Sequence, residues 1–249
     1  MNFKSELAKI LAQVMSIKIQ RAIGSIYGFV KLSSKSYSLY GEDLVINHLF
    51  HNIGIKIGVY VDIGAFHPKW ISNTYLLSKK GWKGIAVDLE PEKLKLFDYS
   101  RSNCKTICAA VVPRKNNDEI EYFAFNRLFS EWDTISYDEA EMRKNKSHFD
   151  YKKIKIPTIT INEVLSEAIL FANQDVDYLN IDVEGIDDEI ITTIDFKKFK
   201  LKCLQFENNK FFKGSKNTQN ILLNAGFVHY ASMGGTHTYV ASNLLKIEY

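Results

Sequence analysis

The stretch that decides the fold is GVYVDIGAFHPKWISN, residues 58–73. Its β-branched run VYVDI predicts a short buried strand, which leads at once to Gly64. A dinucleotide-binding unit begins in the same way, but it needs further glycines so that the backbone can approach two phosphates. Here the following residues include the bulky Phe66 and His67 and then Pro68, which has no N–H group to offer. The stretch therefore disfavours a dinucleotide-dependent dehydrogenase.

An acidic residue also ends the next predicted strand. The segment GIAVD finishes at Asp88, 24 residues after Gly64, and the ribose-binding acid of a dinucleotide fold follows its glycines by roughly 20 residues. A phosphate-free nucleoside with an amino-acid tail needs close backbone approach at Gly64 and a carboxylate for its ribose hydroxyls. We therefore predict that Asp62, Gly64 and Asp88 bind S-adenosylmethionine. The alternative is that the two acids only close loops at strand ends.

From residue 40 onward, predicted strands alternate with predicted helices. The expected strands are residues 59–63, 84–88, 105–112, 119–125, 155–161, 177–185 and 201–209, with a closing hairpin at 226–242. The expected helices are residues 43–50, 72–80, 91–102, 162–171, 186–193 and 218–225. Units of this kind form a mostly parallel sheet with helices on both faces, and ligands bind at the carboxyl ends of its strands.

Two segments stand apart from this alternation. Within residues 1–36, apolar side chains recur at steps of four and three and basic residues outnumber acidic ones, which predicts a basic amphipathic helix over residues 1–31. Such a helix can lie on an anionic membrane surface, associate with another helix, or pack on the domain that follows, residues 37–249. Residues 126–153 are polar and weakly periodic, which predicts an insertion or lid.

The composition argues against several classes of protein. A net charge of +3 is too small to indicate nucleic-acid binding without a clustered basic face. No apolar run reaches the roughly 18 residues of a membrane span, and charged residues interrupt any secretory signal. Three cysteines without a paired spacing favour a reducing compartment, the cytoplasm, and Cys104 and Cys108 are expected in the core.

Three segments carry a resemblance to a known family. YGEDLVINHLF, VDIGAFHPKWISNTYLLSKKGWKGIAVDLEPEKLKLF and DYLNIDVEGIDDEII resemble the motifs of the FkbM-type methyltransferases, which belong to the class I S-adenosylmethionine-dependent superfamily, and the similarity spans roughly residues 37–240. The resemblance implies a Rossmann-like, seven-stranded sheet with an antiparallel last strand. It also implies O-methylation, often of sugar hydroxyls. The chain departs from the pattern at Tyr40, where relatives often read Ser-Gln, and in residues 126–153, which match no known motif.

More residues are expected around the methyl donor. Ser72, Asn73 and Thr74 begin the first crossover helix, where free N–H groups and hydroxyls can bind the methionine carboxylate or simply cap the helix. The predicted donor site is completed by residues at the ends of the other strands: Ala65, Leu89, Ala110 and Asp182.

Three residues are candidates for the catalytic base. Asp182 and Glu184 are two apart, so within a strand their side chains point the same way, and like charges in close quarters raise a carboxyl pKa toward neutrality. Glu184 can instead cap the next helix. His67 follows the donor loop, although a lone histidine is more often structural.

A metal site is a further expectation. Asp182, Glu207 and Asn208 offer oxygen ligands at the ends of neighbouring strands, a set that suits Mg²⁺ and is similar to the metal site of catechol O-methyltransferases. A bound Mg²⁺ would orient the acceptor hydroxyl and lower its pKa. The acid pair alone can also act as the base without a metal.

The leading interpretation is an S-adenosylmethionine-dependent O-methyltransferase that acts on a sugar hydroxyl, in a bacterial surface glycan or its precursor. The enzyme is expected in the cytoplasm, with residues 1–31 contacting the inner membrane surface or a second copy. One alternative is a methyltransferase of a soluble small metabolite. The other is a nucleoside-binding module without catalysis, although such a module need not keep all of the acids at the strand ends.

Overall fold

The structure is a computed structural model, and it describes residues 35–126, 130–208 and 214–245. The described residues from 36 onward form one compact unit. The predicted amphipathic helix of residues 1–31 lies outside the described residues and stays a prediction. In the described part of the chain, no helix has the length and apolar character that crossing a bilayer requires.

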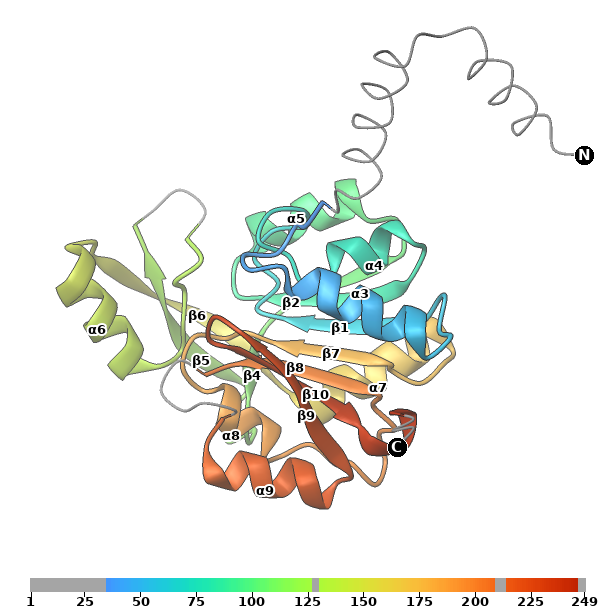
Figure 1. Ribbon diagram of the computed structural model, residues 1–249. Helices are drawn as coiled ribbons and strands as arrows, with labels where there is room; N and C mark the ends of the chain where they lie inside the picture. Colours follow the sequence, from blue (N-terminus) through green and yellow to red (C-terminus); the bar gives the residue numbers. More distant parts are fainter. Residues whose placement is uncertain (1–34, 127–129, 209–213, 246–249) are drawn as a thin grey trace, which may run out of the picture. The chain divides into compact units, whose positions relative to one another are not determined.

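The main sheet has seven strands within the described residues (Figure 1). In spatial order they are β3 (Cys104–Cys108), β2 (Lys83–Asp88), β1 (Val59–Ile63), β7 (Tyr178–Ile181), β8 (Cys203–Glu207), β10 (Thr236–Ala241) and β9 (Phe227–Met233). The pairs from β3 to β8 are parallel, and β10 runs antiparallel to both of its neighbours. The predicted parallel sheet and its antiparallel closing hairpin are confirmed.

The helices of the main unit lie close to where the sequence predicts them. They are α3 (Glu42–Asn52), α4 (Tyr75–Lys79), α5 (Pro91–Ser100), α7 (Ile161–Ala172), α8 (Asp187–Ile191) and α9 (Lys216–Asn224), followed by the 3₁₀ helix η1 (Ser242–Leu244). α7 begins with a capping box, in which Thr160 and Glu163 satisfy each other's backbone N–H groups. α4 starts three residues later than predicted, although Ser72 still accepts the N–H of Tyr75 at 3.2 Å.

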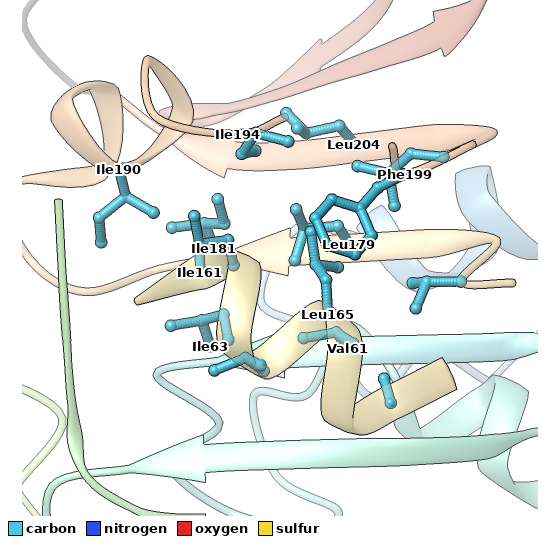
Figure 2. Packing of buried hydrophobic residues seen from close by; sticks show 14 of the residues in the cluster. Val61, Ile63, Ile161, Leu165, Leu179, Ile181, Ile190, Ile194, Phe199 and Leu204 are labelled. Carbon is cyan, nitrogen blue, oxygen red and sulfur yellow. The ribbon is translucent and has the colours of Figure 1, made fainter. Parts of the chain in front are cut away.

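The core fills both faces of the sheet because its central strands place buried apolar side chains on both sides. All five residues of β1 are buried, as expected for a parallel strand between two layers of helices. Val61 and Ile63 pack with Leu165 of α7 on one face (Figure 2). Tyr60 packs with Ile46 of α3 in a separate cluster, because alternate residues of a strand face opposite sides. Each fully buried aliphatic side chain contributes about 1.5–3 kcal/mol.

A smaller sheet flanks residues 126–153, the segment that the sequence predicts as an insertion or lid and that we call the insertion. Its strands are β4 (Ala110–Val112), β6 (Tyr151–Thr160) and β5 (Glu119–Phe125), in the order β4-β6-β5. Helix α6 (Tyr137–Ser147) follows β5 and precedes β6 along the chain, and it stands beside this small sheet (Figure 1). Phe123, Phe125 and Ala140 form a buried cluster there. The described part of the insertion is therefore an ordered subdomain with apolar packing of its own.

Four strand predictions were wrong in detail, and one of them is the strand predicted at 155–161, which is β6 and begins four residues earlier, at Tyr151. The predicted strand 105–112 is two strands in different sheets, because β2 ends at Asp88 and leaves the chain after Cys108 without a partner in the main sheet. β3 is consequently an edge strand, so Cys104 is only half-buried and Cys108 is exposed. The predicted strands 177–185 and 201–209 end early, at Ile181 and Glu207. The acids after Ile181 therefore lie in a loop, where strand alternation does not apply.

Candidate active site

A cavity lies at the carboxyl ends of β1, β2 and β7, where the fold predicts a ligand. We call it the inner cavity; its empty volume is about 500 Å³, part of it open to solvent. Predicted site residues that line it are Gly64, Asp88, Leu89, Ala110, Asp182 and Glu184. Val87, Val111 and Ile135 add apolar walls. The structure thus brings together the strand ends that the sequence singled out.

Asp88 lines the inner cavity and also closes two loops. Its carboxylate accepts the N–H of Phe66 at 2.8 Å and the N–H of Glu90 at 3.1 Å. Its side chain is only 6% exposed. The loop-closing role that the sequence left as an alternative is therefore present in the structure, and a ribose contact by the same carboxylate remains a proposal.

Lys93 is a residue of this cavity that the sequence analysis missed. Its buried ammonium lies 3.5 Å from Asp88 and 2.9 Å from Asp133. Burial opposes the charge of Lys93, but the two carboxylates outweigh it and raise its pKa. Asp133 precedes α6 and also accepts the N–H of Phe125 at 3.0 Å. Asp133 lies 40 residues after Lys93, in the predicted insertion. No local sequence pattern could therefore have indicated that the two residues pair.

Gly64 is also needed within the chain itself, apart from the donor contact that we predict for it. Its φ is +75°, and a Cβ atom at this position would lie 1.7 Å from the backbone oxygen of Asp182. The close approach is therefore between the chain's own strand ends, β1 and β7. A side chain here would push apart the two loops that line the inner cavity.

The predicted residues after Gly64 belong to a buried hydrogen-bond network centred on Arg101. The Arg101 guanidinium donates to Ser72 and Thr74, each at 2.8 Å, and to the carbonyl of Pro68 at 2.9 Å. Thr74 in turn donates to Asp62. Arg101 is 3% exposed. The sequence analysis did not identify Arg101, because nothing in its neighbours along the chain indicates these contacts.

Asn180 of β7 extends this network to a second strand. Its amide donates to Asp62 at 2.9 Å and its carbonyl accepts from Asn73 at 3.1 Å. Burial raises the pKa of Asp62, and Arg101 opposes that shift. Ala65 is buried in the core next to the same loop. These predicted donor-site residues thus hold the 64–74 loop, and any contact of theirs with the donor remains a proposal.

His67 is held in a turn. Its Nδ1 accepts the N–H of Lys69 at 3.1 Å and the N–H of Trp70 at 2.9 Å. Burial lowers its pKa, and the charges of Arg101 and Lys69 act in the same direction. A neutral ring that accepts at Nδ1 carries its proton on Nε2, so neither nitrogen is free to take a proton. These contacts favour the structural role for His67.

Three carboxylates meet at the ends of β7 and β8. Oxygens of Asp182, Glu184 and Glu207 lie within 4.8 Å of one another. Burial, Glu207 and Glu184 raise the pKa of Asp182 well above its ordinary value. Burial and Glu207 likewise raise the pKa of Glu184 to about 8, against the opposing charge of Arg143. Asn208, a predicted metal ligand, donates its amide to Asp188, and Glu184 is the third carboxylate of the acid cluster.

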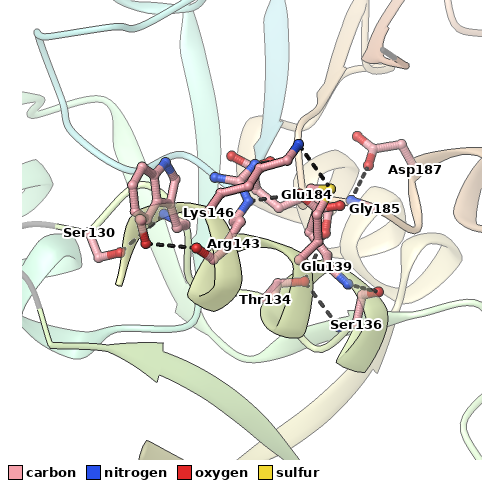
Figure 3. Close-up of polar contacts among 12 residues, drawn as sticks. Ser130, Thr134, Ser136, Glu139, Arg143, Lys146, Glu184, Gly185 and Asp187 are labelled. Carbon is pink, nitrogen blue, oxygen red and sulfur yellow. Dashed lines mark hydrogen bonds and ion pairs between the residues drawn. The ribbon is translucent and has the colours of Figure 1, made fainter. Parts of the chain in front are cut away.

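Contacts from the insertion hold the Glu184 loop (Figure 3). Arg143 of α6 donates to the Glu184 carboxylate and, at 2.7 Å, to Glu139. Thr134 donates to the backbone carbonyl of Glu184 at 2.8 Å. Glu184 has a φ of +59°, a left-handed conformation that costs of order 1–3 kcal/mol for a residue with a side chain. Such strain persists where the surrounding contacts determine the geometry, as they do here.

A second, more open cavity adjoins the acid cluster. We call it the outer cavity; its empty volume is about 1480 Å³, including open solvent. Its walls come from α6, from α8 and from the start of α9, and almost all of the residues that line it carry polar or charged side chains. Glu207 lines the outer cavity, Asp182 lines the inner one, and Glu184 lines both. The acid cluster therefore stands between two spaces that separate ligands can enter.

The strand order, the antiparallel β10 and a ligand cavity at the carboxyl ends of the strands define the class I methyltransferase fold. The model of the FkbM methyltransferase domain matches residues 62–229, and the chain belongs to that family. It is therefore a methyltransferase that depends on S-adenosylmethionine. No curated protein matches the chain in sequence.

The chain is also similar to solved methyltransferase structures. One is a TehB-like SAM-dependent methyltransferase from Corynebacterium glutamicum, with 9% identity, 89% of this chain and 96% of the other covered, and a TM-score of 0.40. A SAM-dependent methyltransferase from Aquifex aeolicus has 12% identity, coverage of 81% and 89%, and a TM-score of 0.37. The 1,6-didemethyltoxoflavin-N1-methyltransferase from Burkholderia thailandensis, solved with S-adenosylhomocysteine, has 11% identity, coverage of 96% and 89%, and a TM-score of 0.37.

Proposed function

We propose that the protein transfers the methyl group to a hydroxyl of a sugar, in a bacterial surface glycan or its precursor. The proposal adds the kind of acceptor to the methyltransferase activity that the family defines. Its principal support is that the inner and outer cavities share Glu184, whose carboxylate lies beside those of Asp182 and Glu207. A carboxylate that can take a proton thus lies where the methyl donor and the sugar hydroxyl would meet.

We assign the inner cavity to the methyl donor. Val87, Leu89 and Val111 give it apolar walls that suit an adenine ring, and Asp88 is the carboxylate that we propose for the ribose hydroxyls. When bound, S-adenosylmethionine supplies an electrophilic methyl group on a positively charged sulfur. Asp182 and Glu184 line the same cavity, where a negative charge favours that cation.

The acid cluster favours a hydroxyl as the acceptor. A sugar hydroxyl holds its proton at neutral pH, so its methylation needs a base, whereas a neutral amine is already a nucleophile. Because the pKa values of Asp182 and Glu184 are raised, the pair is a stronger base than an ordinary carboxylate. We propose that the pair takes the hydroxyl proton as one unit. A positioned base of this kind contributes roughly 10²–10⁴-fold to the rate.

A second mechanism would use the same carboxylates to hold Mg²⁺. Asp182, Glu184 and Glu207 offer oxygen ligands within 4.8 Å of one another, and Mg²⁺ takes oxygen ligands. A cation there would lower the pKa of the acceptor hydroxyl. Assays after dialysis against a chelator separate the mechanisms. Loss of activity that Mg²⁺ restores supports the metal, and full activity without metal supports the carboxylate base.

The assay of the proposed function uses S-adenosylmethionine with an isotopically labelled methyl group and a panel of oligosaccharides. We expect labelled methyl ethers on sugar hydroxyls, located by mass spectrometry. Asp182→Asn and Glu184→Gln should each reduce kcat by about 10²-fold or more. Both variants should still bind S-adenosylhomocysteine. Labelling of amines alone, with sugars unmodified, would contradict the proposal.

We also propose a cytoplasmic enzyme whose residues 1–31 bind the inner membrane surface, near lipid-linked glycan. The support is the excess of basic residues on an amphipathic pattern in this segment. Flotation with anionic vesicles, for the full chain and for a chain lacking residues 1–31, tests the idea. Equal partitioning of the two chains would remove it, and a change of oligomeric state between them would favour self-association through the same segment.

A further inference from the structure

One face of α6 lines the outer cavity. Glu139, Met142, Arg143 and Lys146 follow one another at steps of three, one and three residues, which places them on the same side of a helix. Figure 3 shows Glu139, Arg143 and Lys146 on the side of α6 nearest Glu184. The insertion thus supplies a continuous wall beside the acid cluster.

This face is held in a fixed position relative to Glu184. Arg143 binds the carboxylates of both Glu139 and Glu184. Thr134, just before α6, donates to the Glu184 backbone carbonyl at 2.8 Å. Gly185 lies so close to α6 that a Cβ atom added to it would be 3.4 Å from the Cβ of Glu139. Because the helix is anchored at three points, its other side chains also have defined positions relative to the acids.

Two side chains of the face take no part in this anchoring. Among the described residues, the only hydrogen-bond acceptor that Lys146 contacts is the Met142 sulfur, at 3.5 Å, and a thioether is a weak acceptor. Lys144 of the same helix instead pairs with Asp150 at 3.0 Å. Met142 is 37% exposed and lines the outer cavity. Both side chains are therefore placed to contact a ligand in the outer cavity.

We propose that Met142 and Lys146 form the acceptor-binding subsite, in which Lys146 donates hydrogen bonds to sugar oxygens and Met142 packs on the apolar face of the ring. This inference rests on the proposed function, because it takes the outer cavity to hold the acceptor. A flexible thioether adapts to an irregular ring surface, and an ammonium group provides three donors for hydroxyl oxygens. Acceptor choice would then depend on the insertion, and donor binding on the strand ends of the main sheet.

The experiment compares Lys146→Ala and Met142→Ala with Lys144→Ala, a matched control that removes an equivalent charge from the same helix away from the cavity. Lys146→Ala should raise the acceptor KM about tenfold, and Met142→Ala should raise it severalfold. The KM for S-adenosylmethionine and the calorimetric Kd for S-adenosylhomocysteine should stay within about twofold of the wild-type values. Lys144→Ala should match the wild type in every measurement.

The two proposals fail in different ways. If the wild type methylates no sugar, the proposed function is wrong, and the same variants are then measured on whichever acceptor the wild type uses. Acceptor KM values that rise only in Lys146→Ala and Met142→Ala support the subsite. Unchanged acceptor KM values overturn it, as does an equal loss of S-adenosylhomocysteine binding.

Discussion

At the scale of single residues, the site depends on side chains kept in unfavourable surroundings. Asp182 and Glu184 are carboxyls in a shielded cluster with Glu207, where their ionised forms repel one another. Glu184 also has a left-handed backbone, at φ +59°. A carboxyl that is reluctant to ionise binds a proton more readily, which is what a base for a sugar hydroxyl requires. The same features should lower the stability of the folded protein.

Asp182→Asn should therefore become relatively more stable than the wild type as the pH rises. The pKa of Asp182 is raised by folding, so its contribution to stability is fully present below about pH 4 and is lost as the pH rises through the folded-state pKa. Asparagine does not ionise, so the variant does not lose this stability as the pH rises. We expect the Tm of Asp182→Asn minus that of the wild type to increase between pH 5 and pH 8.

Differential scanning calorimetry at the two pH values measures this difference, and Asp150→Asn is the control. Asp150 is a carboxyl whose pKa is lowered by Lys144, so its replacement should give no gain at pH 8. A Tm difference that stays constant or falls between pH 5 and pH 8 would contradict the prediction and indicate that Asp182 is ionised and paired with a cation.

At this scale the sequence indicated the right acids but partly for the wrong reason. Asp182 and Glu184 were expected side by side because they are two apart in a strand. They meet because β7 stops at Ile181 and the insertion draws the next residues into a strained loop. Arg101, Lys93 and Arg143 escaped notice because each acts through partners that are distant in sequence. Lone cations on helices or in loops carry no local signal of such contacts.

At the scale of elements, the loop from Gly64 to Thr74 depends on one buried cation. Arg101 donates hydrogen bonds to the middle of this loop, at the carbonyl of Pro68, and to its end, at Ser72 and Thr74. Phe66 and Ile71 have positive φ values of 51° and 49°, conformations that need support from their surroundings. Arg101 therefore holds this loop, which approaches the inner cavity, in position.

Replacing Arg101 should weaken both the fold and donor binding. Arg101→Ala leaves the Asp62 network without its cation, at a cost of about 3–5 kcal/mol. Arg101→Lys keeps the charge but not the planar fork, so it should restore part of the stability and less of the binding. We expect the Kd for S-adenosylhomocysteine to rise at least about tenfold in Arg101→Lys, by calorimetry. A normal Kd with a lowered urea midpoint would mean that the loop does not contact the donor.

Prediction of the elements succeeded where the pattern is local. β1 is a continuous buried run with the bounds that its β-branched residues indicate, and the closing hairpin turns at its two glycines. The division of residues 105–112 between two sheets could not be predicted, because it depends on where the neighbouring strand β2 ends. The helix and the packing within residues 130–153 were also missed, because aromatic packing between β5 and α6 has no simple period.

At the scale of the whole molecule, the insertion contacts both cavities. Asp133 joins it to Lys93 and Asp88 at the inner cavity, and Arg143 joins it to Glu184 at the edge of the outer one. A ligand that engages Asp88 therefore acts on a residue already linked to the insertion. Filling the inner cavity should steady the wall of the outer cavity.

We expect S-adenosylhomocysteine to slow amide hydrogen exchange in residues 130–151 of the wild type. Lys93→Met, which keeps the apolar stem, should lose most of this effect because Asp88 and Asp133 are no longer joined. Lys95→Met is the control, since Lys95 is exposed on the same helix and pairs only with Glu92 among the described residues. Hydrogen exchange detected by mass spectrometry, at saturating ligand, measures the slowing in residues 130–151. Equal slowing in Lys93→Met and the wild type would show that Lys93 does not transmit the effect.

The route of the chain through the insertion has a consequence for how such enzymes diversify. The excursion leaves β5 at Phe125 and returns at Tyr151, two residues that face each other in an antiparallel ladder. Its two ends are thus neighbours, so recombination can exchange the whole cassette without shifting the register of any strand in the main sheet. A lineage could acquire new acceptors in this way while inheriting an unaltered methyl-donor half.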